Sequence, residues 1–527
     1  MISWNKTLVS EGLDEIAISQ EETLISVKSI MDAYHGWDKP TEYYDVLMGD
    51  WILHFTHQVY IARKELELSN AVDPHLPVPV FADQIEFLAQ CVETASLQKQ
   101  LQWILKGLSE DTVLRSLRFA RDSVTIINRR RESLLAKCAR WISTSKPLVL
   151  VTDPYIKCSR LMWAHALIKW RGWVSWNSIA YPIRVVAKLH SEWRTARAAT
   201  SARTENTLVA SIRVLLPVFM PVVFLEGFSS YRKQVLAFPI ARPRAVYTAQ
   251  ALHTHLAWKF LMAEWKEKGT LLLNHQHGGG YGIDRAHAIE EFEVRVADRF
   301  YTFGWHTKKT STIPLSQPSL QTRGRKRTRL LLSCMAMPKN PYRLHYQPMP
   351  GTIERVHNET NDFLLSLVNR RHLLIRPDTT DYGWGNVKMM QDIVPGVEID
   401  NRKKTAACRF AESKLVIHNS LGTGWLETLS LDIPTLCFFE PDAYAFRGSA
   451  QGYVDALEAA GIVHRSGSSA AQFINRLEDN IDQWWNKPLV QTARQAFVDH
   501  YANYSNNWIM QWEKEFKSVL STGTRAN

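Results

Sequence analysis

The residues best suited to chemistry lie in a glycine-rich segment that directly follows an apolar run. Residues 275–282 read HQHGGGYG, with four glycines among the last five positions. Glycines are costly in a folded backbone, so this run indicates close contact with another backbone or with a ligand. A neutral histidine here could take a proton from a substrate, and a protonated one could bind a phosphate or carboxylate. We predict an acceptor-binding loop formed by His275, Gln276, Gly278, Gly279 and Tyr281.

Carboxylates follow this loop within a short helical pattern. On a helix, Glu290 and Glu293 would share a face. A carboxylate near His277 could orient the imidazole or could itself remove a proton from an acceptor hydroxyl. We therefore predict His277 as the general base, with Glu290 as the second candidate and Glu293 beside them. A solvated acidic helix face is the alternative.

The histidine pair also raises the question of a metal. The His-x-His spacing of His275 and His277 would put two imidazoles on one face of a strand, as in some metal sites. No neighbouring cysteine or well-spaced carboxylate completes a ligand set, so we expect no metal and no other cofactor. A purely structural loop remains a further alternative.

A second glycine-rich turn, residues 420–424 (SLGTG), separates an apolar run from a helical segment. A turn of this kind lets a phosphate reach the backbone and the free N–H groups of a helix start. Glu427 follows closely enough to accept hydrogen bonds from a ribose. We predict that a nucleotide binds here. An ordinary structural βαβ unit is the alternative. The expected contacts are Ser420, Gly422, Thr423, Gly424 and Glu427.

A third polar segment follows the apolar run 371–376. Arg376 stands at the expected strand end, where an arginine suits phosphate recognition. Asp381 and Tyr382 follow, and an aromatic ring could stack on a base or a sugar. We assign all three to the same donor site. An arginine paired with a local aspartate is the alternative.

These segments must be positioned by alternating strands and helices. Apolar runs at 147–152, 245–248, 270–274, 330–334 and 415–417 predict buried strands, with a helix from about Leu252 to Lys268. Alternation of this kind indicates parallel α/β sheets, whose ligands bind at the carboxyl ends of the strands. We predict four parts. They are a helical N-terminal region (1–145), a Rossmann-like acceptor domain (146–307), a linker (308–329), and a Rossmann-like nucleotide-donor domain with C-terminal helices (330–527).

Composition limits the possible partners. The 527 residues are 45% hydrophobic and 22% charged, with a net charge of +11. This basic balance suggests an anionic partner, but no nucleic-acid-binding motif is present, so we expect none. The basic run 323–329 reads as a solvated linker or, alternatively, as a contact with anionic membrane headgroups. The polar N-terminus and short apolar stretches predict a cytoplasmic protein, with peripheral attachment to the inner membrane as a variant.

Taken together, the motifs resemble a family of bacterial transferases of surface-carbohydrate synthesis, which make O-antigen or capsule. The resemblance spans most of the chain, including residues 276–282, 290–298, 303–305, 381–384, 422–429 and 484–485. This family is similar to capsule-type glycosyltransferases that use CMP-activated ulosonic or nonulosonic acids. One departure is that those relatives often carry a His-Pro pair where this chain reads His418-Asn419.

The resemblance implies a two-Rossmann-domain (GT-B-like) glycosyltransferase without a required metal. Its donor would be a nucleotide-activated sugar, CMP-linked by preference, and its acceptor a glycan or lipid-linked glycan. Two alternatives stay open. One is a transferase of polyol phosphate that uses CDP-glycerol, and the other is a non-catalytic module that binds polysaccharide or nucleotide.

Overall fold

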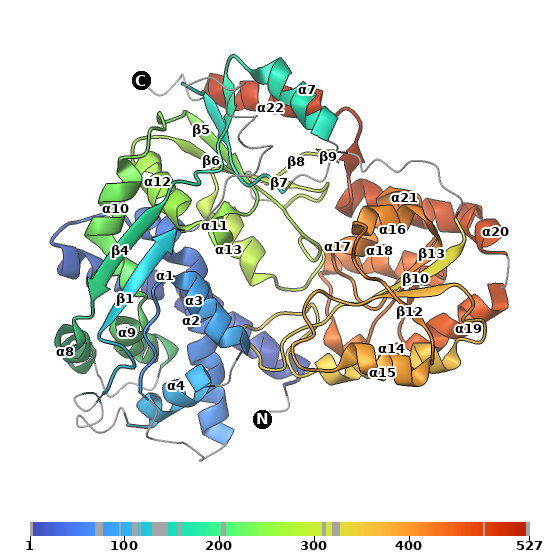
Figure 1. Ribbon diagram of the computed structural model, residues 1–527, viewed down its shortest axis with the longest axis horizontal. Helices are drawn as coiled ribbons and strands as arrows, with labels where there is room; N and C mark the ends of the chain where they lie inside the picture. The colour runs from blue at the N-terminus through green and yellow to red at the C-terminus, as the bar shows by residue number, and fades with distance from the viewer. Residues whose placement is uncertain are drawn as a thin grey trace.

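The molecule consists of two α/β domains, which lie side by side in Figure 1. The computed structural model describes residues 4–68, 77–93, 96–107, 114, 117–128, 146–155, 160–201, 207–307, 312–318, 327–477 and 480–522. Each domain is built on a six-stranded sheet. All strand pairs within both sheets are parallel.

The sheet of the first domain has the strand order β3-β2-β5-β6-β7-β8. Its strands are β2 (Val149–Val151), β3 (Val174–Trp176), β5 (Ala245–Thr248), β6 (Leu271–His275), β7 (Arg299–Thr302) and β8 (Thr312–Pro314). The central strands are apolar and buried, as expected for parallel strands covered on both faces. The strand order reverses between β2 and β5, and ligands bind beside such a reversal.

The sheet of the second domain has the order β12-β11-β10-β13-β14-β15. Its strands are β10 (Arg329–Ser333), β11 (Leu373–Arg376), β12 (Glu398–Ile399), β13 (Ser413–His418), β14 (Thr435–Phe438) and β15 (Val463–His464). Counted along the chain, this is the 3-2-1-4-5-6 order of a Rossmann fold, with its reversal between β10 and β13. The predicted fold of two Rossmann-like domains is therefore confirmed.

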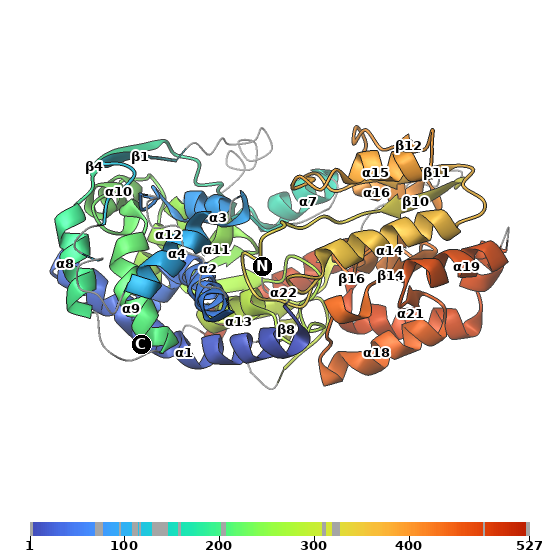
Figure 2. The same ribbon diagram turned by 90° about the horizontal axis from the view of Figure 1, so that it is seen from below.

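Helices cover both sheets (Figure 2). Those of the first domain are α7 (Arg160–Trp170), α8 (Ser191–Ser201), α9 (Leu208–Phe219), α10 (Phe228–Leu236), α11 (Ala251–Thr254), α12 (Leu256–Lys266) and α13 (Ala288–Val296). Those of the second are α14 (Ile353–Ser366), α15 (Asn386–Ile393), α16 (Ala406–Ala411), α17 (Thr423–Ser430), α18 (Gly448–Ala459), α19 (Gly467–Leu477), α20 (Ile481–Trp485) and α21 (Pro488–Tyr501).

The N-terminal region is helical, as predicted, but it is not a separate body. Its helices are α1 (Lys6–His35), α2 (Thr41–Leu68), α3 (Gln84–Glu93) and α4 (Ser96–Lys106). Residues 43–62 of α2 are all buried, and α2 packs against α12 and α13 of the first domain. One strand was not predicted in this region. β1 (Ser123–Asn128) pairs antiparallel with β4 (Ile183–Lys188). Residues 129–145 lie outside the described residues.

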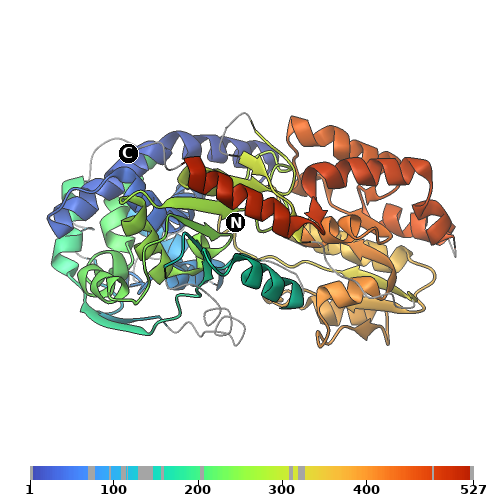
Figure 3. The ribbon, with the colours of Figure 1, turned by 90° about the horizontal axis from the view of Figure 1, so that it is seen from above.

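The end of the chain returns to the first domain. Helix α22 (Trp508–Thr522) crosses onto it in Figure 3, and β16 (Tyr504–Ser505) pairs with β9 (Gln317–Pro318). Trp508 and Trp512 join a buried cluster with Trp170 and Val149 of the first domain. The prediction that the second domain extends to residue 527 is therefore wrong for residues 504–522, because the tryptophans of this segment are buried in the core of the first domain.

The predicted linker, residues 308–329, is only partly described. Its residues 312–318 contain β8, which extends the first sheet, and β9, which pairs with β16, so this part does not connect the two domains freely. Most of the basic run 323–329 lies outside the described residues. Within the described part of the chain, no helix is both long enough and apolar enough to cross a membrane.

Candidate active site between the domains

The two predicted glycine-rich segments meet where the domains face each other. The first follows β6 and the second follows β13, so each stands at the carboxyl end of a central strand. The backbone N–H of Gly279 donates a hydrogen bond to Thr423 Oγ1 at 3.1 Å. A Cβ atom built on Gly279 would lie 2.7 Å from the carbonyl carbon of Gly422. Close backbone approach, which the glycine run predicted, is therefore confirmed.

His277 lies beside this junction and is held by two neighbours. Its Nδ1 atom is 3.4 Å from Glu293 Oε1 and 3.2 Å from the hydroxyl of Tyr281. The Tyr281 hydroxyl donates to Glu293 Oε2 at 2.8 Å. The His277 side chain is 19% exposed, whereas that of Glu293 is fully buried. One imidazole edge thus faces a fixed carboxylate, which is the arrangement that orients a catalytic base.

Two further residues extend this pair into the protein. His253, on α11, lies between two carboxylates, with Nε2 2.7 Å from Glu293 Oε1 and Nδ1 2.6 Å from Asp50 Oδ1. Asp50 comes from the buried helix α2. A continuous chain of polar groups therefore runs from Asp50 through His253 and Glu293 to His277.

Sequence reasoning missed Asp50 and His253. The sequence predicts one helix from about Leu252 to Lys268. In the structure this segment is divided at His255 into a short helix α11, which follows β5, and the longer helix α12. His253 thereby stands at the strand-order reversal of the first sheet. A histidine just after a predicted strand was the available signal.

Positive and negative charges alternate along this series of polar groups. Burial alone raises the pKa of Glu293, but the charges and hydrogen bonds of His277 and His253 outweigh it and lower that pKa well below its usual range. Burial lowers the pKa of His253, but Asp50 and Glu293 outweigh it and raise that pKa. Near neutral pH, an imidazolium thus stands between two carboxylates. An ionised Glu293 would stabilise the positive charge that forms when His277 accepts a proton.

The same residues are also the candidate metal ligands. One ligand atom each from His253, His277 and Glu293 lies within 4.8 Å of the others. His275 is not part of this set, so the ligand set differs from the His-x-His pair that was considered as an alternative from the sequence. Both ring nitrogens of His253 already contact carboxylates, so a cation here would have to displace the proton on Nε2. The absence of a metal stays a prediction.

His275 and Gln276 form their hydrogen bonds within the first domain, around the end of β6. His275 is fully buried, with Nδ1 3.1 Å from the Tyr247 hydroxyl, and burial lowers its pKa to about 3. Gln276 Oε1 accepts hydrogen bonds from the Phe303 N–H at 3.0 Å and from Trp305 Nε1 at 2.8 Å. Both residues anchor the end of β6 beneath the loop, and we correct their expected role in contacting an acceptor.

Glu290 links the two domains through a hydrogen bond and an ion pair. Its Oε2 accepts the Gly282 N–H at 2.7 Å, and its Oε1 pairs with Arg447 of the second domain at 2.9 Å. Arg447 also donates to the carbonyl of Asp284 at 2.7 Å. Because both carboxylate oxygens are engaged, Glu290 is poorly placed to act as the alternative base.

The predicted nucleotide turn has the expected local form. Gly422 immediately precedes α17, which begins at Thr423, and the turn lies at the β10/β13 reversal of the second sheet. Gly424 packs against His418, and a Cβ there would approach the ring to 3.0 Å. Ser420 is buried, and Glu427 is 3% exposed. Burial and the charge of Glu427 raise the pKa of nearby Tyr504.

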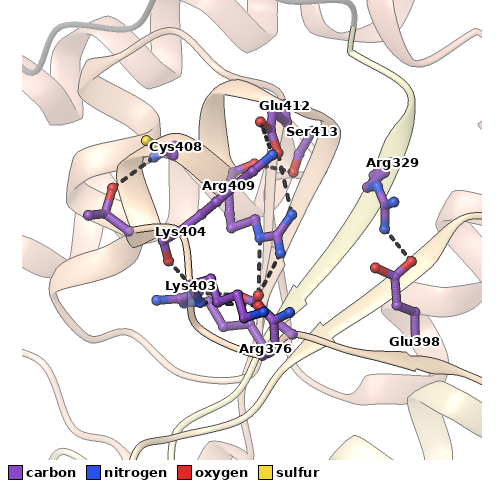
Figure 4. A network of polar contacts seen from close by, with 12 residues as sticks. Arg329, Arg376, Glu398, Lys403, Lys404, Cys408, Arg409, Glu412 and Ser413 are labelled. Carbon is purple, nitrogen blue, oxygen red and sulfur yellow. Dashed lines mark hydrogen bonds and ion pairs between the residues drawn. The ribbon is translucent and has the colours of Figure 1, made fainter.

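The third predicted segment is already engaged within the second domain (Figure 4). Arg376 pairs with Asp400, which also binds Arg409 at 2.8 Å. Asp381 accepts hydrogen bonds from the N–H groups of Gly385 and Asn386 at 2.7 and 2.9 Å, so it caps α15. Tyr382 takes a left-handed backbone conformation with φ 53°. Their assignment to a donor site stays a prediction, and for Arg376 the alternative of a local aspartate partner is what the structure shows.

Comparison with known proteins gives one family and several distant structures. A family model described as LIC12162 family transferase matches residues 10–516. The solved structures include MurG of Acinetobacter baumannii, at 12% identity and TM-score 0.35, covering 71% of this chain and 99% of MurG. A Rickettsia africae glycosyltransferase has 11% identity and TM-score 0.37, covering 72% and 99%. A Listeria monocytogenes protein described as a UDP-N-acetylglucosamine 2-epimerase has 10% identity and TM-score 0.41, covering 73% and 98%. The search of curated proteins found no match.

Proposed function

The chain belongs to the LIC12162 family of transferases, and we propose that it moves a sugar from a nucleotide-activated donor to a carbohydrate acceptor. The observation that carries this proposal is the position of the Glu293–His277 pair. His277 lies in the loop that contacts the glycine turn before α17, and Glu293 of α13 faces it, so a candidate base and a candidate phosphate site share one junction.

The chemistry follows from these contacts. His277 Nδ1 faces Glu293, which leaves Nε2 to take the proton from an acceptor hydroxyl. The hydroxyl oxygen forms a bond to the anomeric carbon of the donor, and the bond from that carbon to the leaving phosphate breaks. The electron pair goes to the phosphate, where the free N–H groups at the start of α17 stabilise the added charge. Contact between Gly279 and Thr423 would exclude water that could hydrolyse the donor.

The finer assignment concerns the donor. We propose a CMP-activated ulosonic or nonulosonic acid, transferred to a glycan or lipid-linked glycan of the cell surface, with Glu427 at the ribose. The resemblance described above supports this choice. The net charge of +11 is compatible with an acidic donor and with peripheral contact at an anionic membrane surface.

A nucleotide panel tests the donor site. The purified chain would be melted with CMP, CDP, UDP, GDP or ADP, each at about 100 times its dissociation constant, which should add roughly 2.7 kcal/mol of stability. Stabilisation by CMP alone supports the proposed donor. Stabilisation by UDP or GDP keeps a glycosyltransferase with another donor, and CDP directs attention to polyol-phosphate transfer. If none stabilises the chain, the donor site is wrongly assigned.

Replacement of the proposed base tests the mechanism. His277→Ala should lower turnover roughly 100-fold or more, because general-base catalysis contributes on that scale. Nucleotide binding should be retained, because His277 belongs to the acceptor side. Unchanged turnover in a folded variant would remove His277 from this role.

A further inference from the structure

Arg343 lies in the loop that joins β10 to α14, and β10 is one of the two strands at the strand-order reversal of the second sheet. Its Nε atom is buried and has no hydrogen-bond partner. Among the described residues, no carboxylate forms an ion pair with its guanidinium. Arginine is a planar donor that suits phosphate and carboxylate, so an unpaired one in such a place is informative.

The loop that carries Arg343 is held in place on both sides. Gln58 of α2 donates to the carbonyl of Tyr342 at 3.0 Å, and the Leu344 N–H donates to His57 Nδ1 at 3.0 Å. On the other side, Gln347 Nε2 donates to the carbonyl of Leu421 at 2.6 Å, next to the glycine turn. The loop that carries Arg343 is thus held between α2 and the proposed nucleotide turn.

A second donor without a partner belongs to His57, which accepts a hydrogen bond from the backbone of the same loop. Because His57 Nδ1 accepts the Leu344 N–H, the proton of the neutral ring must be on Nε2. This Nε2 atom is buried and has no partner, in a residue that is 0% exposed. Leaving a buried donor unpaired is costly, so two of them together indicate a missing acceptor.

The positive charge of Arg343 acts on several buried neighbours. Burial is the main cause that lowers the pKa values of His57, His287 and His345, and Arg343 lowers all three further, after His54 in the case of His57. Asp284 is also close, but burial outweighs the effects of the arginines and raises its pKa well above the usual range. Two permanent positive charges, those of Arg343 and Arg447, therefore act on this region.

We propose that Arg343 and His57 form a subsite for an anionic group, a phosphate or a carboxylate, of one of the two substrates. The proposal rests on the proposed function only in naming that group as part of a substrate. Arg343 supplies charge and a fork of N–H donors, and His57 Nε2 supplies one further N–H. The contact of this loop with Leu421, through Gln347, favours a donor phosphate, whereas the position of His57 on α2 favours an acidic acceptor.

Calorimetric titration of the full chain with inorganic phosphate and pyrophosphate tests the subsite. Arg343→Gln should weaken binding about 10-fold or more, as expected for the loss of a charge-assisted hydrogen bond. Arg343→Lys should retain part of the affinity, because it keeps the charge but loses the fork. Arg184→Gln, an exposed position on β4, is the matched control and should bind as the unaltered chain does. Circular dichroism would establish that each variant is folded.

Further ligands identify the source of the anion. If Arg343→Gln weakens binding of CMP or UDP but not of the free nucleoside, the group is the donor phosphate. If it weakens only glycerol phosphate or a free sugar acid, the group belongs to the acceptor. Equal affinity of every anion for the unaltered chain and for Arg343→Gln would overturn the subsite.

A measurement on the unaltered chain covers the case in which Arg343→Gln does not fold. In nitrogen-15 spectra of the imidazoles, phosphate should shift the Nε2 signal of His57, and an unmoved signal at saturating phosphate would also overturn the subsite. None of these measurements needs turnover, so an inactive enzyme would contradict the proposed function without affecting this result.

Discussion

The backbone N–H of Gly279 in the first domain donates a hydrogen bond to Thr423 Oγ1 in the second, across 3.1 Å. The two glycine-rich segments that contain these residues each lie at the carboxyl end of a strand in their own sheet, more than a hundred residues apart in sequence. The position of the proposed base therefore depends on how closely the domains approach each other at this point.

Gly279→Ala should disrupt this approach. Its Cβ would lie 2.7 Å from the carbonyl carbon of Gly422, which is backbone and cannot simply rotate away. Because displacing reacting groups by about 1 Å can cost on the order of 100-fold, we expect turnover to fall on that scale while the chain remains folded. Gly278→Ala is the matched comparison, since its nearest atom is Thr423 Oγ1 at 3.4 Å. Equal turnover in the two variants would contradict the steric argument.

Glu293→Gln should reduce both turnover and stability. The amide cannot stabilise a charged His277, so we expect turnover to fall roughly 100-fold. It also leaves the charged His253 with one carboxylate in place of two, which should cost about 1–3 kcal/mol. Steady-state kinetics and urea unfolding would measure the two effects. Glu291→Gln, at an exposed position of the same helix, should change neither. A fully active Glu293→Gln would rule out the orienting role.

Stability should fall as the pH rises through the neutral range, because of His253. Its pKa is raised from 6.5 to about 9, so the native chain holds a proton that the unfolded chain releases above pH 6.5. The contribution is complete below pH 6.5, and about 2 kcal/mol of it should be lost between pH 6.5 and 8. Above pH 8, buried Lys259 titrates in the opposite direction, because burial lowers its pKa to about 8.

Chemical unfolding at several pH values would check this dependence. His253→Gln, less stable overall, should show a flatter profile between pH 6.5 and 8, because the titrating group is gone. If the unaltered chain and the variant lose stability in parallel over this range, the proton is not held by His253.

Glu427→Gln should separate recognition of the ribose from recognition of phosphate. If Glu427 accepts hydrogen bonds from ribose hydroxyls, the amide should weaken nucleotide binding about 10-fold and leave inorganic pyrophosphate binding unchanged. Titration calorimetry with both ligands would measure this. Glu354→Gln, at an exposed position of α14, is the control. Weaker binding of pyrophosphate as well would point to an indirect effect on the helix start.

Much of the fold could be predicted from the local pattern of apolar residues. Short apolar runs predicted β2, β5, β6, β10, β11 and β13 to within a few residues, because parallel strands that are buried on both faces must be largely apolar. The antiparallel pair β1/β4 was not predicted, since its alternating half-exposed pattern is weak in isolation. The return of residues 504–522 to the first domain was also not predicted, because the sequence places their tryptophans next to the second domain.

The sequence by itself determined the two glycine-rich turns and the candidate base, since glycine spacing and strand ends are local properties of the chain. Only the tertiary structure decided their partners. Asp50 and His253 reach Glu293 from separate elements, while Glu290 is taken by Arg447 and Arg376 by Asp400. Burial makes an unpaired charge costly, so the partner of each group depends on which elements pack around it, and spacing along the chain does not contain that information.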